Sequence, residues 1–203
     1  MVETTRRREI EDVASSLFRE HGYAATSVRD IARALDIQGA SLYAHVSSKQ
    51  DVLWSIVERT AARFEAAADA AIAGHGEADT GSGSRLAALV RAHVGVITDD
   101  IGRASVFVHE WRALTGERHA QIARRRDAYE GRFRSLIADG VSVGRFTPLD
   151  PAVTAAFILT SLNGIAAWYR PDGRIRPTSL ADAYAELVLH AVQARDAPGE
   201  AMR

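Results

Sequence analysis

Apolar residues recur at intervals of three and four positions along almost the whole chain, which is the period of an α-helix. The first stripe is Ile10, Val13, Ala14, Leu17 and Phe18. Because side chains three and four positions apart share one helix face, such stripes predict amphipathic helices. No alternating stretch is long enough to predict a β-strand. The sequence therefore predicts an all-α fold of about nine helices.

The apolar stripes and their capping residues set the expected helix limits. After the first helix, which should end at Gly22, the ranges are 28–35, 40–46, 49–73, 84–99, 101–114, 117–140, 150–169 and 178–195. Asp150 is placed to cap its helix, with Pro151 at the first helical position. We expect a small unit at residues 1–48 and a larger one at residues 49–203, with the helix 49–73 connecting them.

The composition excludes several classes of chemistry. The 203 residues carry a net charge of -1 and contain no cysteine, so disulfides, thiolate metal sites and a cysteine nucleophile are ruled out. The polar N-terminus lacks the apolar core of a signal peptide, and a cysteine-free chain fits a cytoplasmic location. Residues 152–169 are uncharged, but several polar side chains and a glycine interrupt them, which favours a buried helix over a membrane span.

The most informative stretch is residues 26–53, where a turn of roughly four residues joins two short helices. This arrangement predicts a helix-turn-helix, a unit that commonly binds the major groove of DNA. Ile31, Ala32, Leu35, Ile37, Leu42 and Val46 can pack the two helices together. That packing would leave Gln38, Ala40, Ser41, Tyr43 and Ala44 facing outward.

The same stretch carries a specific family resemblance. Residues 26–32, TSVRDIA, followed by 41–49, SLYAHVSSK, closely resemble the signature of TetR-family repressors, with Val46 where phenylalanine is usual. The resemblance implies a homodimer that represses transcription from a palindromic double-stranded DNA operator. It also implies a C-terminal domain that binds a small hydrophobic effector, which releases the operator.

The candidate DNA-binding residues follow from the motif and from the resemblance. They are Thr26, Ser27, Arg29, Gln38, Gly39, Ala40, Ser41, Tyr43, His45 and Lys49. Gln38 can pair with adenine, and Ala40 can contact a thymine methyl group. Lys49 opens a helix, where an anion is favoured, so we predict a phosphate contact rather than a solvated charge. Thr26 and Ser27 are helix caps in either case, and His45 suits a phosphate contact or a packed core equally well.

The C-terminal half resembles the TetR subgroup that senses acyl-CoA thioesters, on residues 108–112, 140–146 and 168–171. Candidate effector residues are Phe107, Glu110, Trp111, Leu114, Tyr129, Phe133, Phe157, Thr160, Asn163 and Trp168. A few polar groups among aromatic rings suit a ligand pocket, although an ordinary core has the same composition. Six arginines, Arg118, Arg124, Arg125, Arg126, Arg132 and Arg134, either meet coenzyme A phosphates or form a solvated helix face.

The last two helices carry the predicted dimer interface. The helix 150–169 is apolar nearly all round, and the helix 178–195 has a stripe that includes Leu180, Leu187 and Val188. In TetR-like proteins, these two helices pair with their copies in a second chain. A monomer would leave a large apolar patch in water, which supports the same pairing here.

Two other classes of protein compete with a DNA-binding regulator. A helical enzyme or metal-binding protein could use His109 with Glu110, or His93 with His119. No zinc-protease spacing, paired-carboxylate motif or nucleophile elbow accompanies these residues, so we predict no enzyme, catalytic residue or metal site. A helical module for protein partners would need a more apolar outward face than residues 38–43 offer.

Overall fold

The computed structural model of the chain describes residues 2–74 and 81–193. Within them lie α1 (Val2–His21), α2 (Val28–Ala34), α3 (Gly39–Tyr43), α4 (Lys49–Ala73), α5 (Ser82–Asp99), α6 (Ile101–His109), a 3₁₀ turn η2 (Trp111–Ala113), α7 (Gly116–Ser142), α8 (Pro151–Trp168) and α9 (Pro177–Val192). The described residues contain no strand, only one isolated bridge between Phe146 and Gln193. The predicted all-α fold is confirmed.

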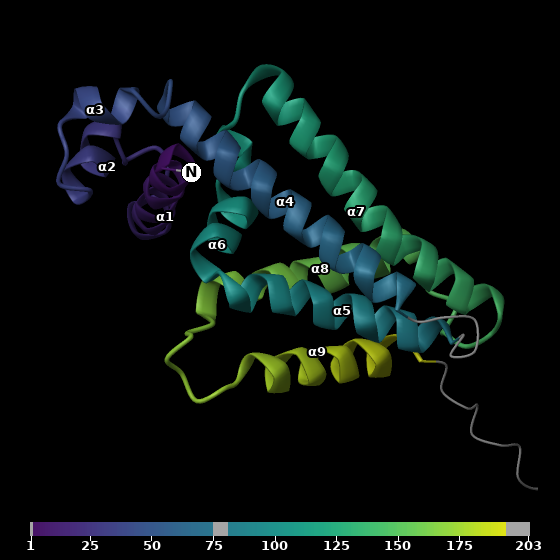
Figure 1. The fold of residues 1–203 in the computed structure, drawn as a ribbon. Helices are drawn as coiled ribbons and strands as arrows, with labels where there is room; N and C mark the ends of the chain where they lie inside the picture. Colours follow the sequence, from purple (N-terminus) through teal and green to yellow (C-terminus); the bar gives the residue numbers. More distant parts are fainter. Residues whose placement is uncertain (1, 75–80, 194–203) are drawn as a thin grey trace, which may run out of the picture.

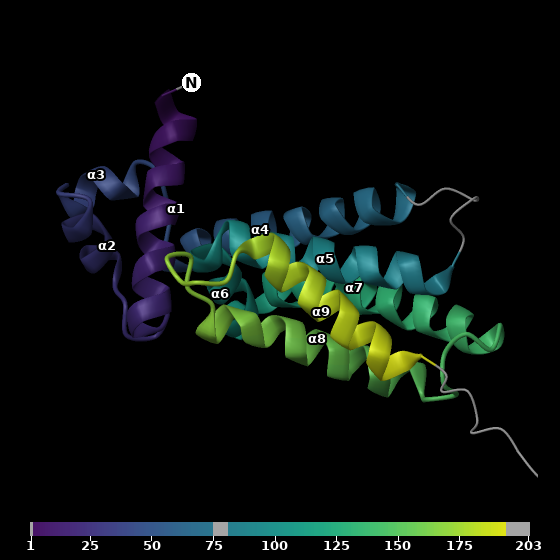
Figure 2. The ribbon, with the colours of Figure 1, turned by 90° about the horizontal axis from the view of Figure 1, so that it is seen from below.

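The helices form a small group and a large group, joined by α4 (Figures 1 and 2). Helices α1, α2 and α3 lie together at one end of the molecule, where α1 contacts both α4 and α6. The long helix α4 runs from this end along α5, α6 and α7. Helix α9 packs on α5, and α8 packs on α5, α6 and α7.

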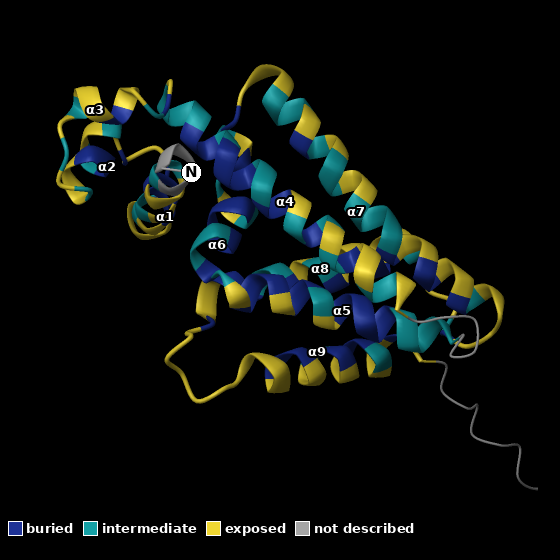
Figure 3. Cartoon of the chain, viewed as in Figure 1, coloured by how far each residue is buried: buried dark blue, intermediate teal, exposed yellow. Residues whose placement is uncertain are grey.

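The buried sides of the helices meet in one core, and their outer sides face solvent (Figure 3). In α1 the predicted stripe supplies Ile10, Ala14 and Phe18, each at most 1% exposed. Burying such side chains contributes about 1.5–3 kcal/mol each for the larger ones, far more than helix propensity does.

Helix starts follow the capping residues that the sequence carries. Ser27 and Asp30 form a reciprocal capping box at the start of α2, and Ser48 accepts a hydrogen bond from the Asp51 N–H at the start of α4. The Asp150 carboxylate accepts the N–H groups of Ala152 and Val153, so α8 begins at Pro151 as predicted.

Two predicted helices end earlier than their apolar stripes suggest. The third was expected at 40–46, but α3 covers Gly39–Tyr43 only. The helix expected at 101–114 stops at His109 and continues as the 3₁₀ turn η2. Because a 3₁₀ turn has three residues, it brings Trp111 and Leu114 to the same side, and both are buried.

Helix α8 is long and apolar enough to cross a membrane by length and composition, alone among the described helices. Its Ile158, Leu162 and Ile165 are fully buried against the rest of the chain, as a core helix requires. Its other side is exposed. We name the exposed apolar side chains Val153, Phe157 and Trp168 of α8, with Leu187 of α9, the outer apolar face.

Candidate nucleic-acid interface and ligand cavity

Helix α3 divides its side chains between the core and the solvent. Leu42 is fully buried and Val46, just beyond the helix, is 3% exposed, so both face inward as predicted. Tyr43 is 57% exposed. The same surface carries the exposed Gln38, Ala40 and Ser41 and the half-exposed Gly39. The segment 38–43 therefore presents small and hydrogen-bonding groups to the outside, with a single aromatic ring at its end.

The start of α2 adds further polar groups beside this segment. The Ser27 hydroxyl is exposed and donates to the Asp30 carboxylate at 2.6 Å. Arg29 is exposed, and no described carboxylate lies within ion-pair distance of it. Arg29 and Gln38 line one shallow surface hollow with Gly39, so the two helices present a continuous polar surface.

Thr26 and Lys49 do not extend this surface. Thr26 is 3% exposed and its hydroxyl donates to the Gly22 carbonyl at 2.9 Å, so the cap is Ser27 alone. The Lys49 ammonium donates to the carbonyl oxygens of Tyr23 and Thr26, each at 2.8 Å, and lies 4.2 Å from the Tyr23 ring centroid. These bonds hold the start of α4 against the loop before α2, and a phosphate contact of Lys49 stays a prediction.

His45 fits both roles that its sequence position allows, a phosphate contact and a packed position in the core. It is half-buried, and its Nδ1 is buried without a hydrogen-bond partner. A role in DNA binding therefore stays a prediction for this residue.

The large helical group contains a partly open cavity of about 310 Å³. Its wall comes from five helices and the 3₁₀ turn: Phe64 of α4, His93 of α5, Phe107 of α6, Trp111 of η2, Arg126 and Tyr129 of α7, and Leu159, Thr160 and Asn163 of α8. Aromatic rings with a few polar groups are typical of a small-molecule site. Five of the predicted effector residues line it: Phe107, Trp111, Tyr129, Thr160 and Asn163.

The other five predicted effector residues lie elsewhere. Leu114 and Phe133 are buried in the core without reaching the cavity. Glu110 turns toward the small helical group, where its Oε1 lies 3.8 Å from the position that a Cβ on Gly22 would take. Phe157 and Trp168 point outward, 63% and 47% exposed, as part of the outer apolar face. Because α8 is apolar on all sides, its sequence does not indicate which side faces the cavity.

His93 is the cavity residue that sequence reasoning placed in a rival site. Its Nδ1 lies 3.0 Å from the Tyr129 hydroxyl, and its ring packs 4.7 Å from the Phe64 ring. Burial lowers the pKa of His93 to about 3, and the positive charge of Arg126 acts in the same direction. Burial also raises the pKa of Tyr129. Both groups are therefore neutral hydrogen-bonding groups in the wall of the cavity.

The α7 arginines are not alike. Five of the six predicted candidates bind a carboxylate: Arg118 with Asp51, Arg124 with Glu117, Arg125 with Glu65, Arg132 with Asp69 and Arg134 with Glu130. Arg126 has no carboxylate within ion-pair distance among the described residues. Its guanidinium instead lies 4.9 Å from the ring centroids of both Phe107 and Trp111, inside the cavity wall.

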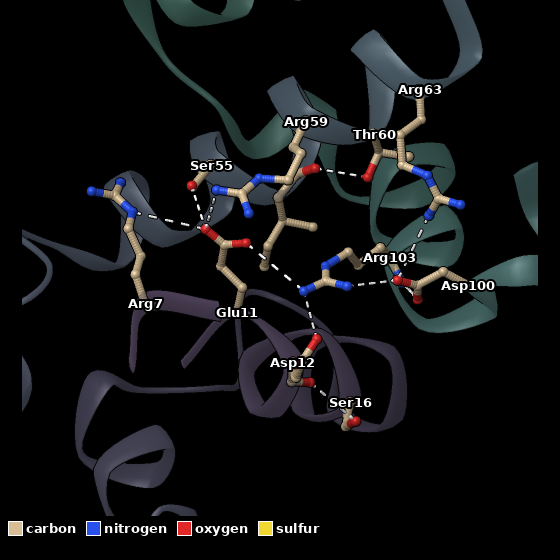
Figure 4. A network of polar contacts seen from close by, with 11 residues as sticks. Arg7, Glu11, Asp12, Ser16, Ser55, Arg59, Thr60, Arg63, Asp100 and Arg103 are labelled. Carbon is tan, nitrogen blue, oxygen red and sulfur yellow. Dashed lines mark hydrogen bonds and ion pairs between the residues drawn. The ribbon is translucent and has the colours of Figure 1, made fainter. Parts of the chain in front are cut away.

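A buried carboxylate joins the small helical group to the large one (Figure 4). Glu11 of α1 is 1% exposed and accepts the Ser55 hydroxyl of α4 at 2.6 Å. Arg59 of α4 lies 3.2 Å from the same carboxylate. Arg103 of α6 lies 2.5 Å from Asp12 and 3.9 Å from Glu11. Since α1 carries α2 and α3, this network fixes the position of the exposed α3 surface relative to α4 and α6.

A second contact joins the two groups at the start of α4. The Gln50 amide donates to the Ala113 carbonyl of η2 at 2.7 Å and to the Tyr23 hydroxyl at 3.0 Å. Ala113 follows Trp111 by two residues, so one side chain connects the cavity wall to the loop that Lys49 holds. We name this contact the Gln50 bridge.

The rival metal site finds no geometric support. His109 is exposed, and Glu110 faces the small helical group. Within residues 2–74 and 81–193, no three or more histidine, cysteine or acidic side chains gather closely enough to hold a metal ion.

Two family models match the chain. Residues 10–56 match the model of bacterial regulatory proteins of the tetR family, and residues 79–192 match the tetracyclin repressor-like C-terminal domain. The second match alone covers more than half of the 203 residues. The two matched ranges correspond to the small and the large helical groups.

Similar proteins are transcriptional regulators. The HTH-type transcriptional repressor KstR2 of Rhodococcus jostii is 27% identical over 190 residues, which cover 91% of this chain and 89% of the relative. The structure of the ketosteroid transcriptional regulator KstR2 of Mycobacterium tuberculosis aligns with a TM-score of 0.81 and 26% identity, over 94% of this chain and 96% of that one.

The structure of a third relative contains both a coenzyme A thioester and DNA. AibR in complex with isovaleryl coenzyme A and operator DNA aligns with a TM-score of 0.75 and 28% identity, over 90% of this chain and 97% of that one. With the helix-turn-helix geometry, the cavity and both family models in agreement, this chain belongs to the tetR family of bacterial regulatory proteins and is a transcriptional regulator.

Proposed function

We propose that two copies of the chain bind a palindromic operator and repress transcription until a small hydrophobic effector enters the cavity. The observation that carries this proposal is the exposed segment 38–43, held on a packed scaffold through α1 and Lys49. Gln38, Gly39, Ala40, Ser41 and Tyr43 would meet base edges and the nearby backbone in the major groove. Ser27, Arg29 and His45 would meet phosphates, because they flank that segment.

We assign Thr26 and Lys49 to support of the motif rather than to DNA contact. Their polar atoms are bonded within the chain. The proposed units are residues 1–48 for DNA binding and residues 49–203 for effector binding and dimerisation, with α4 connecting them. Because a bacterial regulator of this kind acts on DNA, we propose a cytoplasmic location. We also propose that the protein has no enzymatic activity.

The outer apolar face is proposed as the dimer interface. Val153 and Phe157 are more than 60% exposed on α8, and Leu187 is 64% exposed on α9. Burying these side chains would stabilise a dimer, and a second copy presents a matching face because a two-fold interface pairs one patch with itself. A two-fold dimer in turn requires a palindromic site.

The effector is proposed to act on α6 and η2, and α4 to carry the movement to the DNA-binding unit. Phe107 and Trp111 line the cavity. Arg103 lies one turn before Phe107 on α6 and binds Asp12 of α1. A ligand that displaces α6 would therefore shift α1, and one that displaces η2 would act through the Gln50 bridge. Such a ligand weakens DNA binding only by its different affinity for the two arrangements.

We propose acyl-CoA thioesters as the first effector class to test. Two things support this choice: the AibR complex contains isovaleryl coenzyme A, and the aromatic rings of Phe64, Phe107 and Trp111 line the cavity here. At about 310 Å³ the cavity lies at the lower end of the range for small-molecule sites. It would take the acyl part, with the adenosine of coenzyme A outside.

The test is a mobility-shift titration of the full chain on the DNA upstream of its own gene, at fixed salt. Wild-type protein should form one complex, and one member of an acyl-CoA panel should dissociate it. Coenzyme A without an acyl group is the matched control. No complex with this DNA or with any sequence selected from a random pool would refute the proposed DNA binding.

A further inference from the structure

Arg126 carries its positive charge in a half-buried position, where a charge without a partner costs free energy. Its side chain lines the cavity beside the rings of Phe107 and Trp111, and its one hydrogen bond within the described residues is a long one of 3.5 Å to the Phe107 carbonyl. Burial lowers the pKa of Arg126, and the nearby charge of Arg112 lowers it further. An arginine stays protonated in spite of this, so the charge is present without a carboxylate partner in the described part of the chain.

Arg112 adds a second cation to the same place. It lines the cavity, its guanidinium lies 4.7 Å from the Trp111 ring centroid, and no described carboxylate pairs with it. Arg112 is exposed, and its charge repels that of Arg126, whose guanidinium lies 4.9 Å from the same ring centroid. The contrast with the other α7 arginines is clear, since carboxylates of α4 or α7 pair with Arg118, Arg124, Arg125, Arg132 and Arg134.

An anion between these two cations would remove both costs. It would neutralise the buried charge of Arg126 and replace the repulsion from Arg112 by attraction. A guanidinium presents a planar fork of donors that suits a carboxylate or a phosphate. In the same wall, Phe64, Phe107 and Leu159 offer apolar surface for the body of such a ligand.

We propose that the effector carries an anionic group that binds Arg126 and Arg112, with its apolar part against Phe64, Phe107 and Leu159. This inference rests on the proposed effector function of the cavity and adds the charge of the ligand. Two sources of the anion share this chemistry: the carboxylate of a free hydrophobic acid, and a phosphate of a coenzyme A thioester. The neutral groups His93 and Asn163 remain for polar atoms of the body.

The experiment measures binding of four probes to the full-length dimer by isothermal titration calorimetry. The probes are octanoate, the neutral 1-octanol, octanoyl-CoA and coenzyme A. We expect at least one of the two anionic octyl probes to bind about tenfold or more tightly than 1-octanol, because a charged hydrogen bond is worth about one to two powers of ten in affinity. Preference for octanoate identifies a carboxylate, and binding of octanoyl-CoA alone identifies a phosphate.

Three variants test whether Arg126 is the group that binds the anion. Arg126→Gln should reduce the preference for the anionic probe by about tenfold or more, whereas Arg126→Lys should keep most of it. Arg124→Gln is the matched control, since Arg124 is on the same helix, exposed and paired with Glu117. It should bind as wild type does. Thermal unfolding of each variant checks that the fold is intact, and the Lys variant keeps the test valid if the Gln variant unfolds.

Equal binding of 1-octanol and both anionic probes, no binding of any probe, or an anion preference that survives in Arg126→Gln would overturn the inference. The mobility shift separates this failure from failure of the proposed function. A neutral effector that releases DNA equally from wild type and Arg126→Gln would refute the anion site alone. An anionic probe that binds through Arg126 without affecting DNA binding would refute the proposed release mechanism alone.

Discussion

At the scale of single residues, exposure separates the side chains that can reach DNA from those that hold the motif in place. Tyr43 is 57% exposed, whereas the Lys49 ammonium is bonded to two backbone carbonyls. Substituting either residue should weaken operator binding, but for different reasons. The two variants therefore need different measurements.

Tyr43→Ala should lower operator affinity by about tenfold without changing stability, because more than half of the side chain is already exposed to water. A mobility-shift titration measures the affinity, and thermal unfolding measures the stability. Val143→Ala, which changes a residue of similar exposure at the far end of α7, is the control. Unchanged affinity in Tyr43→Ala would remove this residue from the interface.

Lys49→Met should lower the free energy of unfolding by about 1–3 kcal/mol, because it leaves the Tyr23 and Thr26 carbonyls without their charged donor. Chemical denaturation measures the loss. Operator affinity should fall with it, since the loop before α2 is no longer held. A Lys49→Met protein with wild-type stability and weaker operator binding would instead support the phosphate contact predicted from sequence.

His93 makes the stability of the protein depend on pH. Its pKa is about 3 in the folded chain and about 6.5 when unfolded, so between these values the unfolded state binds more protons and stability rises with pH. The loss at pH 5 relative to pH 7.5 is about 2 kcal/mol. His93→Gln should remove this part of the slope, measured by denaturation at both pH values. An identical slope in the variant would contradict the assignment.

The sequence predicts some of these residues well because their environment follows from local pattern. Leu42 faces inward because it lies on an apolar stripe, and Tyr43 must then face outward. Phe157 and Trp168 were predicted for the cavity and lie outside it, because composition cannot tell an inward from an outward aromatic ring on an apolar helix. Arg126 could not be separated from its neighbours either, since its lack of a carboxylate partner depends on the packing of α4 against α7.

At the scale of helices, the start of α4 is the place where the two units meet. It contributes Lys49 to the loop before α2 and the Gln50 bridge to η2. The limits of α4, Lys49–Ala73, agree with the sequence prediction because Ser48 supplies a clear cap. The early end of α6 at His109 carries no glycine or proline signal, and it is this end that forms η2 and places Ala113 near Gln50.

Gln50→Ala should reduce the effect of ligand on DNA while leaving ligand binding intact. The bridge is a hydrogen-bonded contact between the cavity wall and the DNA-binding unit, so its loss should lower the ligand-induced change in operator affinity about fivefold or more. The measurement compares operator affinity with and without the acyl-CoA that releases wild type best. Gln121→Ala, on the exposed side of α7, is the control. Full release from Gln50→Ala would exclude the bridge from the mechanism.

At the scale of the whole molecule, the exposed segment 38–43 and the outer apolar face serve one proposed function, binding of a dimer to DNA. A single recognition segment of a few residues specifies few base pairs, and the outer apolar face offers the means to bring a second segment alongside. Leu187→Glu should therefore give a monomer by light scattering and lose operator binding together. Val143→Glu, which places the same charge at a residue of similar exposure outside the outer apolar face, should remain a dimer. A dimeric Leu187→Glu protein would place the interface elsewhere.

The most direct test of the regulator account is selection of bound sequences from random DNA by the wild-type dimer, followed by footprinting of the selected site. The selected site should be a palindrome whose half-sites are centred one helical turn or more apart, with protection in the major groove of each half and weaker enrichment by Tyr43→Ala. Selection of a site without two-fold symmetry, or equal enrichment by wild type and Tyr43→Ala, would contradict the placement of two α3 segments in successive major grooves.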